Sequence, residues 1–318
     1  IRDRYNRDVK KKGDWGGIFI LGNAPINKKD EVWELDYGLE PPSSGLMGYG
    51  GSDETSNSGI LKYVRIEYAG KRTKHYGYFN ALTLVAIGNE TVLENIMVSY
   101  CQGSSFYVLG GNTKLYQLVS FRSKRNDFIF NYGAQSTLTN SLAIKSPYHT
   151  TSGGASSIYL ASYDEEEEID LTKKGTNLYA ENLTLFVLSD NLEEDRKVGL
   201  VHEAMYVKKG ASFKIAKSIF SGFNPAVNLD RNILINDENL SKMQFVKMYF
   251  NNCNGNIFTE SIQNNEDLEN WYGNRAFGNV YSRGLDSETF IDVKNLNKPD
   301  FRLRINRIIA SSVPEDDY

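Results

Sequence analysis

What this sequence lacks excludes several classes of protein. It has no apolar run of about 18 residues, the length that a membrane-spanning helix needs, and no segment with the pattern of a signal peptide. It has only two cysteines, Cys101 and Cys253, and three histidines. We therefore interpret the cysteines as buried thiols, with a disulfide as the alternative, and predict no metal site and no cofactor. The net charge of −4 lacks the basic excess typical of nucleic-acid-binding proteins.

The first 14 residues are almost free of apolar side chains and carry several arginines and lysines diluted by aspartates. We interpret residues 1–14 as the polar lead-in of a truncated N-terminus, because the sequence begins with Ile1 rather than methionine. The missing signal pattern therefore says nothing about export.

Short β-branched and aromatic segments, each ending near Gly, Asn or Ser, are what the sequence has in abundance. They lie at 58–70, 81–88, 93–100, 115–121 and 127–130, and no proline occurs between Pro42 and Pro147. The triplet Val-Ser-Tyr that begins at Val98 is similar to the triplet Val-Ser-Phe that begins at Val119. Two segments that begin at Asn95 and Asn140 likewise share an asparagine followed two residues later by an apolar side chain. A recurrence of about 20–25 residues is typical of a parallel β-helix. We predict an all-β fold, a right-handed parallel β-helix solenoid, with a β-sandwich as the alternative.

The solenoid is expected to form a single domain over residues 15–318. Two stretches interrupt the pattern and are interpreted as long loops, 23–57 and 146–176, the second containing an acidic run at 164–168. From about residue 228 the character changes, and we expect a C-terminal closing segment. Such a segment would cover the last coil, which otherwise leaves an unpaired sheet edge.

Specific stretches resemble a known family. They are Trp15–Pro25, Tyr49–Gly70, Leu93–Tyr100 and Phe106–Gly111. Over residues 13–145 the chain is similar to secreted or surface-anchored parallel β-helix proteins of Bacteroidetes. The resemblance implies export and a cell-surface, outer-membrane-associated or extracellular location, often through a lipid anchor. It implies no established enzyme activity.

The chain departs from that family at its acidic positions. Family members usually carry paired and clustered aspartates, where this chain has Gly103-Ser104 and Arg125-Asn126-Asp127, and it has Tyr107 where glutamate is usual. Only Asp127 of the acidic set remains. Any cation binding or acid–base chemistry of that cluster is therefore expected to be lost here.

Two kinds of side chain are candidate binding residues. Aromatic residues in the long loops, with one histidine, suit stacking on a sugar ring or packing against the body. Charged residues in the turn after residue 121 form the best mixed cluster, although local ion pairs in a turn give the same pattern. We predict no catalytic residue, since no hydrolase, zinc-protease or P-loop motif is present. The candidate binding residues are Trp33, Tyr37, Tyr148, His149, Arg122, Lys124, Arg125 and Asp127.

Two functional hypotheses follow. The first is a non-catalytic cell-surface or secreted binding or structural protein. One form of it would be an accessory lipoprotein subunit of an outer-membrane complex. Its partner would be a surface protein or a glycan, contacted through loops 28–57 and 146–176. The alternative is a polysaccharide-active lyase or glycoside hydrolase, which would show two carboxylates about 5–10 Å apart or a bound calcium ion. A homomeric scaffold joined through sheet edges is a weaker third hypothesis.

Overall fold

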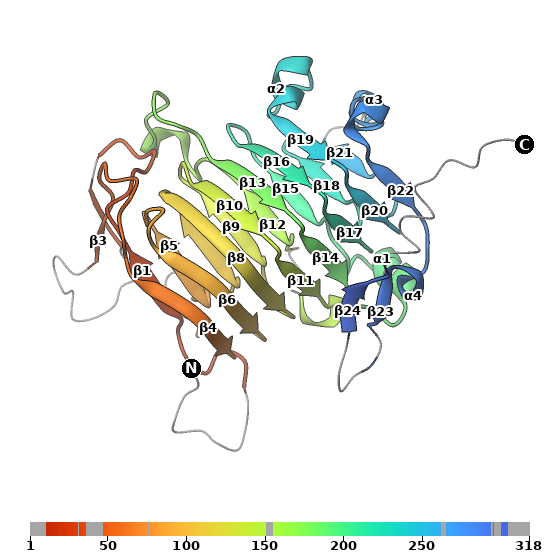
Figure 1. Cartoon of the computed structure of the whole chain (residues 1–318), viewed down its shortest axis with the longest axis horizontal. Coiled ribbons are helices and arrows are strands. Elements are labelled where there is room, and N and C mark those ends of the chain that lie inside the picture. Colours follow the sequence, from red (N-terminus) through yellow and green to blue (C-terminus); the bar gives the residue numbers. More distant parts are fainter. Residues whose placement is uncertain are drawn as a thin grey trace, which may run out of the picture.

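The computed structural model describes residues 11–30, 32–35, 47–74, 77–150, 155–261, 265–293, 295 and 300–304. Its strands stack as coils of a solenoid (Figure 1). Within the described residues one sheet has eight strands, all paired in parallel. In sheet order they are β1 (Ile18–Leu21), β5 (Leu82–Val85), β7 (Phe106–Leu109), β9 (Phe128–Asn131), β12 (Ile158–Leu160), β15 (Met205–Val207), β18 (Val227–Leu229) and β21 (Phe258–Glu260).

The second sheet is bent and supplies two further faces of each coil. It begins with three long strands, β4 (Ile60–Glu67), β6 (Val92–Ser99) and β8 (Asn112–Phe121). In later coils each long strand is replaced by two shorter ones. These are β10 (Gln135–Thr139) with β11 (Leu142–Lys145), β13 (Asn177–Glu181) with β14 (Thr184–Val187), β16 (Ser212–Ala216) with β17 (Ile219–Ser221), β19 (Met243–Val246) with β20 (Tyr249–Asn251), and finally β22 (Val280–Ser282).

A column of left-handed residues makes the bend. In successive coils the register aligns Asn95, Gln117, Asn140 and Asn182, each with φ between 52° and 57°. Asparagine tolerates this conformation better than most residues, and Asn182 Nδ2 donates to Asn140 Oδ1 at 3.0 Å. The parallel pairing confirms the predicted β-helix and excludes the β-sandwich.

The core is a set of inward ladders running through the coils. Phe106 stacks on Phe128 in the next coil with ring centroids 5.3 Å apart, and both are fully buried. Near the C-terminal end Phe245 contacts a cluster of rings. Its partners are Phe213, Phe220, Phe250, Phe258 and Tyr272. Cys101 and Cys253 are free thiols.

The closing segment begins later than the predicted residue 228. Strands β18 to β22 continue the coils to Ser282, with helices α2 (Asp237–Ser241) and α3 (Glu266–Tyr272) in their turns. The boundary was wrong because α2 and α3 interrupt the strand pattern. Helix α3 contributes the buried Leu268 and Tyr272, and the Tyr272 ring stacks on Phe258 with centroids 4.3 Å apart.

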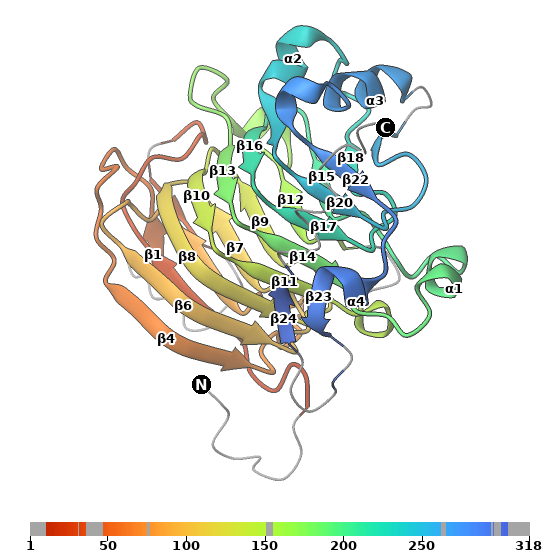
Figure 2. The ribbon, with the colours of Figure 1, turned by 45° about the vertical axis from the view of Figure 1, so that its right-hand side comes forward.

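The C-terminal elements lie against the side of the solenoid. Helix α4 (Asp286–Thr289) and the antiparallel strands β23 (Phe290–Asp292) and β24 (Asp300–Leu303) lie beside β11 and β14 (Figure 2). There Phe290 covers Ile144 and Phe186 in a separate apolar cluster. This segment therefore packs on an outer sheet face.

The two predicted loops each contain strands, and an ion pair joins them. Loop 23–57 contains the antiparallel pair β2 (Trp33–Glu34) and β3 (Gly48–Tyr49). The prediction of a continuous loop over 146–176 is wrong, because β12 within it is a regular strand of the first sheet; two 3-10 turns, at Pro147–His149 and Glu166–Glu168, flank it. Lys28 joins the loops by an ion pair to Glu168 at 3.3 Å.

Other short elements lie in the turns between strands. Helix α1 (Leu192–Lys197) lies between β14 and β15, and a 3-10 turn spans Arg275–Phe277. Among the described residues, none of the helices combines the length and apolar character that crossing a membrane requires.

Candidate functional site

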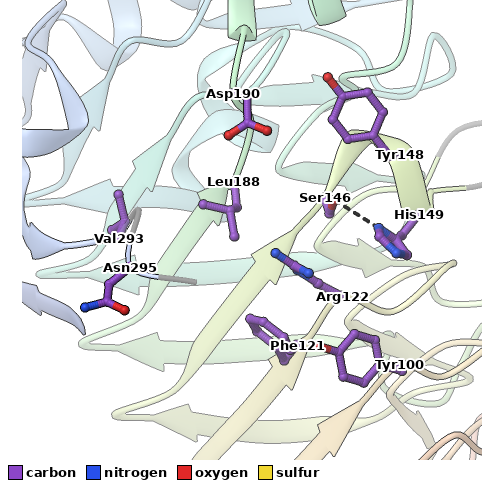
Figure 3. A pocket seen from close by; sticks show the side chains of 10 residues that line it. All are labelled: Tyr100, Phe121, Arg122, Ser146, Tyr148, His149, Leu188, Asp190, Val293 and Asn295. Carbon is purple, nitrogen blue, oxygen red and sulfur yellow. Dashed lines mark hydrogen bonds between the residues drawn. The ribbon is translucent and has the colours of Figure 1, made fainter. Parts of the chain in front are cut away.

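A cleft of about 380 Å³ opens where the strands of the bent sheet end (Figure 3). Its walls come from successive coils, because each strand of this face ends at the same level and turns there. The C-terminal segment after β23 forms the opposite side. The lining residues are Tyr100, Phe121, Arg122, Ser146, Tyr148, His149, Leu188, Asp190, Val293 and Asn295.

A row of aromatic rings extends from the cleft, where Tyr100 and Phe121 line it, to Tyr68 in the preceding coil. Tyr68 stacks on Tyr100 with centroids 5.3 Å apart and 10° between ring planes. Tyr100 meets Phe121 of the next coil edge to face at 5.6 Å. Tyr68, Tyr100 and Arg122 have left-handed φ values of 54° to 58° at equivalent positions, which turn the chain at the end of each strand.

Four cations accompany these rings. The ammonium of Lys12 lies 5.7 Å from the Tyr100 ring, and the guanidinium of Arg122 lies 5.1 Å from the Phe121 ring. Lys124 and Arg125 both lie over the ring of Tyr78, at 5.6 and 5.7 Å. We call Lys12, Tyr68, Tyr100, Phe121 and Arg122 the basic–aromatic strip.

The two cations of the strip, like the neighbouring Lys124 and Arg125, have no acidic partner in the described part of the chain. No ion pair there includes Lys12, Arg122, Lys124 or Arg125. Nε of Arg122 is buried and has no hydrogen-bond partner among these residues. Burial lowers the pKa of Lys12, and the charges of Arg122 and Lys124 lower it further. The strip is therefore a site of positive potential that an anion would relieve.

His149 and Tyr148 lie on a 3-10 turn at the rim of the cleft. His149 Nδ1 and Ser146 Oγ share a hydrogen bond at 3.1 Å (Figure 3). Burial, followed by the charges of Lys12 and Arg122, lowers the pKa of His149, so the imidazole is neutral at pH 7. Tyr148 is 62% exposed, and the nearby Asp195 carboxylate raises its pKa.

Three of the predicted binding residues, Arg122, Tyr148 and His149, line this cleft. Lys124 and Arg125 follow Arg122 in the same turn and lie over Tyr78. Sequence reasoning missed Tyr100 as a site residue. The recurring triplets that begin at Val98 and Val119 could have indicated it, because each ends in an aromatic residue that lines the cleft.

The other predicted residues lie elsewhere. Asp127 is fully buried inside the solenoid, where its side chain faces Lys145, so it does not join the charged residues of its own turn. Trp33 lies in the joined loops, where its ring is 4.1 Å from the Lys28 ammonium. Tyr132 covers the same ammonium from 4.6 Å. Tyr37 lies outside the described residues.

Among the described residues, no group of three or more His, Cys, Asp or Glu side chains is placed so that it could hold a metal ion. Asp190 is the single carboxylate among the described residues that line the cleft. The arrangement is thus suited to holding an anion next to an apolar ring.

Comparison with known proteins gives one match. Residues 5–285 match the model of a family described as a pectate-lyase like beta helix domain. No curated protein and no solved structure gives a significant match. The predicted resemblance to a parallel β-helix family is confirmed at this level, and a source in the Bacteroidetes stays a prediction.

Proposed function

This chain belongs to the pectate-lyase-like β-helix family, and from that premise we propose that it is a non-catalytic protein that binds an acidic polysaccharide in the cleft. It acts at the cell surface or outside the cell. The ligand is a sugar polymer that carries carboxylate or sulfate groups. The sequence also suggested a protein partner within an outer-membrane complex. We favour a glycan because the groups that line the cleft suit a sugar polymer.

One observation carries the proposal: four cations that form no ion pair with any described residue gather on one edge of a protein whose net charge is −4. Arg122 offers a planar guanidinium, which forms paired hydrogen bonds with carboxylate or sulfate oxygens. The neighbouring rings of Tyr100 and Phe121 present the apolar face on which a sugar ring stacks.

The shape of the strip also suits a polymer. Adjacent strands lie about 4.8 Å apart, so residues from successive coils form a straight row. Tyr68, Tyr100 and Arg122 occupy equivalent positions in three successive coils, and Phe121 precedes Arg122 directly. An extended chain of sugars that follows the row would meet one ring or cation in each coil.

The composition of the cleft favours binding over hydrolysis. Glycoside hydrolysis with two carboxylates requires a pair about 5–10 Å apart. Asp190 is the only carboxylate in the described lining, and its neighbours are rings, Arg122 and His149. A polymer bound here therefore finds recognition groups without that catalytic pair.

The test is affinity electrophoresis of the full chain through gels that contain polygalacturonate, alginate, a sulfated glycosaminoglycan or a neutral glucan. We expect retardation by acidic polymers that weakens with added salt, because salt screens exposed charges. We also expect no new reducing ends or unsaturated sugars after long incubation. Equal retardation by the neutral glucan, or release of products, would contradict the proposal.

A further inference from the structure

A lysine and an aspartate face each other inside the solenoid. Asp127 precedes β9, and Lys145 is the last residue of β11 in the same coil. Their exposed fractions are 0% and 4%. Lys145 Nζ lies 3.4 Å from Asp127 Oδ2. A buried ion pair is costly because both charges lose their hydration, and the loss is seldom fully recovered.

The carboxyl group of Asp127 is held by a chain of serines. Ser120 Oγ donates to Asp127 Oδ1, and Ser120 and Ser105 share a hydrogen bond at 2.7 Å. Ser105 is bonded in turn to Ser123. Asp127 Oδ2 has no hydrogen-bond partner among the described residues and faces the amine. The two oxygens therefore have different surroundings.

The amine is also fixed in place. Lys145 Nζ donates to the backbone carbonyl of Arg125. A cavity of about 10 Å³ lies beside Lys145, between Pro147 and His202. That volume is about what one water molecule occupies.

Burial favours the uncharged forms of both groups. It raises the pKa of Asp127, an effect that the Lys145 charge opposes. It lowers the pKa of Lys145, an effect opposed by Asp127 and by the more distant Glu203. A neutral amine is a nucleophile, and a protonated carboxyl group is the form that can lose water.

We propose that Lys145 and Asp127 condense into an intramolecular isopeptide bond. Lys145 Nζ attacks Cγ of Asp127, the Cγ–Oδ2 bond breaks, and Oδ2 leaves as water with its own proton and one from the amine. The second amine hydrogen stays on the new amide nitrogen. No oxidant or reductant is needed, since one carboxylic acid and one amine give one amide and one water. The hydrogen bond from Ser120 stabilises the charge that develops on Oδ1.

The cross-link would join the two chain segments that carry the cleft. Residues 122–127 hold Arg122, Lys124 and Arg125, and Ser146 follows Lys145 directly. The bond fixes the spacing of these segments from inside the solenoid. It removes a buried charge pair at the same time. The inference is independent of any ligand in the cleft.

The intact mass of the denatured full chain tests the proposal. We expect a mass lower than that of the sequence by one water molecule. After proteolysis, tandem mass spectrometry should find a branched peptide that joins Lys145 to Asp127. Variants Lys145→Arg and Asp127→Ala should have their full sequence masses. Because mass is read on denatured protein, a variant that folds poorly still reports.

A matched control uses an exposed ion pair. Lys217 lies 2.7 Å from Glu181 on the surface, where both groups stay hydrated and charged. The Lys217→Ala variant should keep the mass deficit of one water. A wild-type chain at its full sequence mass would overturn the proposal, and so would a water loss that maps to any other pair of residues.

Discussion

The guanidinium of Arg122 lies 5.1 Å from the ring centre of Phe121, the residue before it in the chain, and no described carboxylate forms an ion pair with it. The proposed function assigns this positive charge, which lies next to the Phe121 ring, to an anionic ligand. The predictions below test what that arrangement does.

Replacing Arg122 with alanine should weaken binding of an acidic polysaccharide about 10- to 100-fold, since a hydrogen bond to a charged group contributes about 1.5–3 kcal/mol. Isothermal titration calorimetry measures the change. Lys242→Ala is the matched control, because Lys242 lies away from the cleft. Its Nζ pairs with Oε1 of Glu238 on α2 at 2.9 Å. Equal losses in the two variants would mean that only net charge matters.

Replacing Tyr100 with leucine should weaken binding about 2- to 10-fold, because a ring-stacking contact contributes about 0.5–1.5 kcal/mol beyond its buried area. The salt dependence of binding should not change, whereas Arg122→Ala should reduce it. The control is Tyr179→Leu on β13, whose ring is 38% exposed. Unchanged affinity of the Tyr100 variant would exclude the aromatic row from the site.

Binding should tighten as the pH falls from about 7 to about 5, the range in which histidine titrates. In the free protein, burial and the charges of Lys12 and Arg122 hold the pKa of His149 below 6.5. A bound anion offsets those charges and raises that pKa, so binding takes up a proton and is favoured at lower pH. Titrations at several pH values check this, and the His149→Gln variant should lose most of the dependence. A dependence of opposite sign would place the anion elsewhere.

Replacing Phe245 with alanine should lower the free energy of unfolding by about 3–5 kcal/mol, the usual cost of emptying the volume of a buried phenylalanine. The ring is fully buried and contacts rings from several coils. Urea unfolding followed by circular dichroism gives the value. Leu234→Ala, at a side chain that is 71% exposed, should change it by less than about 0.5 kcal/mol. Similar effects at both positions would contradict the core described here.

The sequence was informative about the coils because each coil repeats the same steric requirement. Asn95 and Asn140 do align two coils apart in the left-handed column. The triplets that begin at Val98 and Val119 predict a register that is wrong by one residue, because Val98 pairs with Ser120 and not with Val119. The Ser120 side chain faces inward and forms hydrogen bonds with Ser105 and Asp127. Because these buried residues are polar, they interrupt the apolar pattern from which strands are predicted.

The site was harder to predict than the fold. Arg122 and Asp127 belong to one turn, and their sequence alone suggests one mixed cluster. The turn places Arg122 at the cleft and Asp127 in the interior. Alternation within a strand fixes which side a residue faces, but it does not extend through a turn. Tyr100 was missed for the same reason, as it follows the last residue of β6.

The measurement that tests the account most directly is calorimetric titration of the full chain with one uronic-acid polymer before and after chemical reduction of its carboxyl groups. The two polymers share a backbone and differ only in charge. The account predicts binding of the acidic polymer, loss of binding after reduction, and weakening by salt. Equal binding of the two forms, or binding of neither this polymer nor a sulfated one, would contradict it.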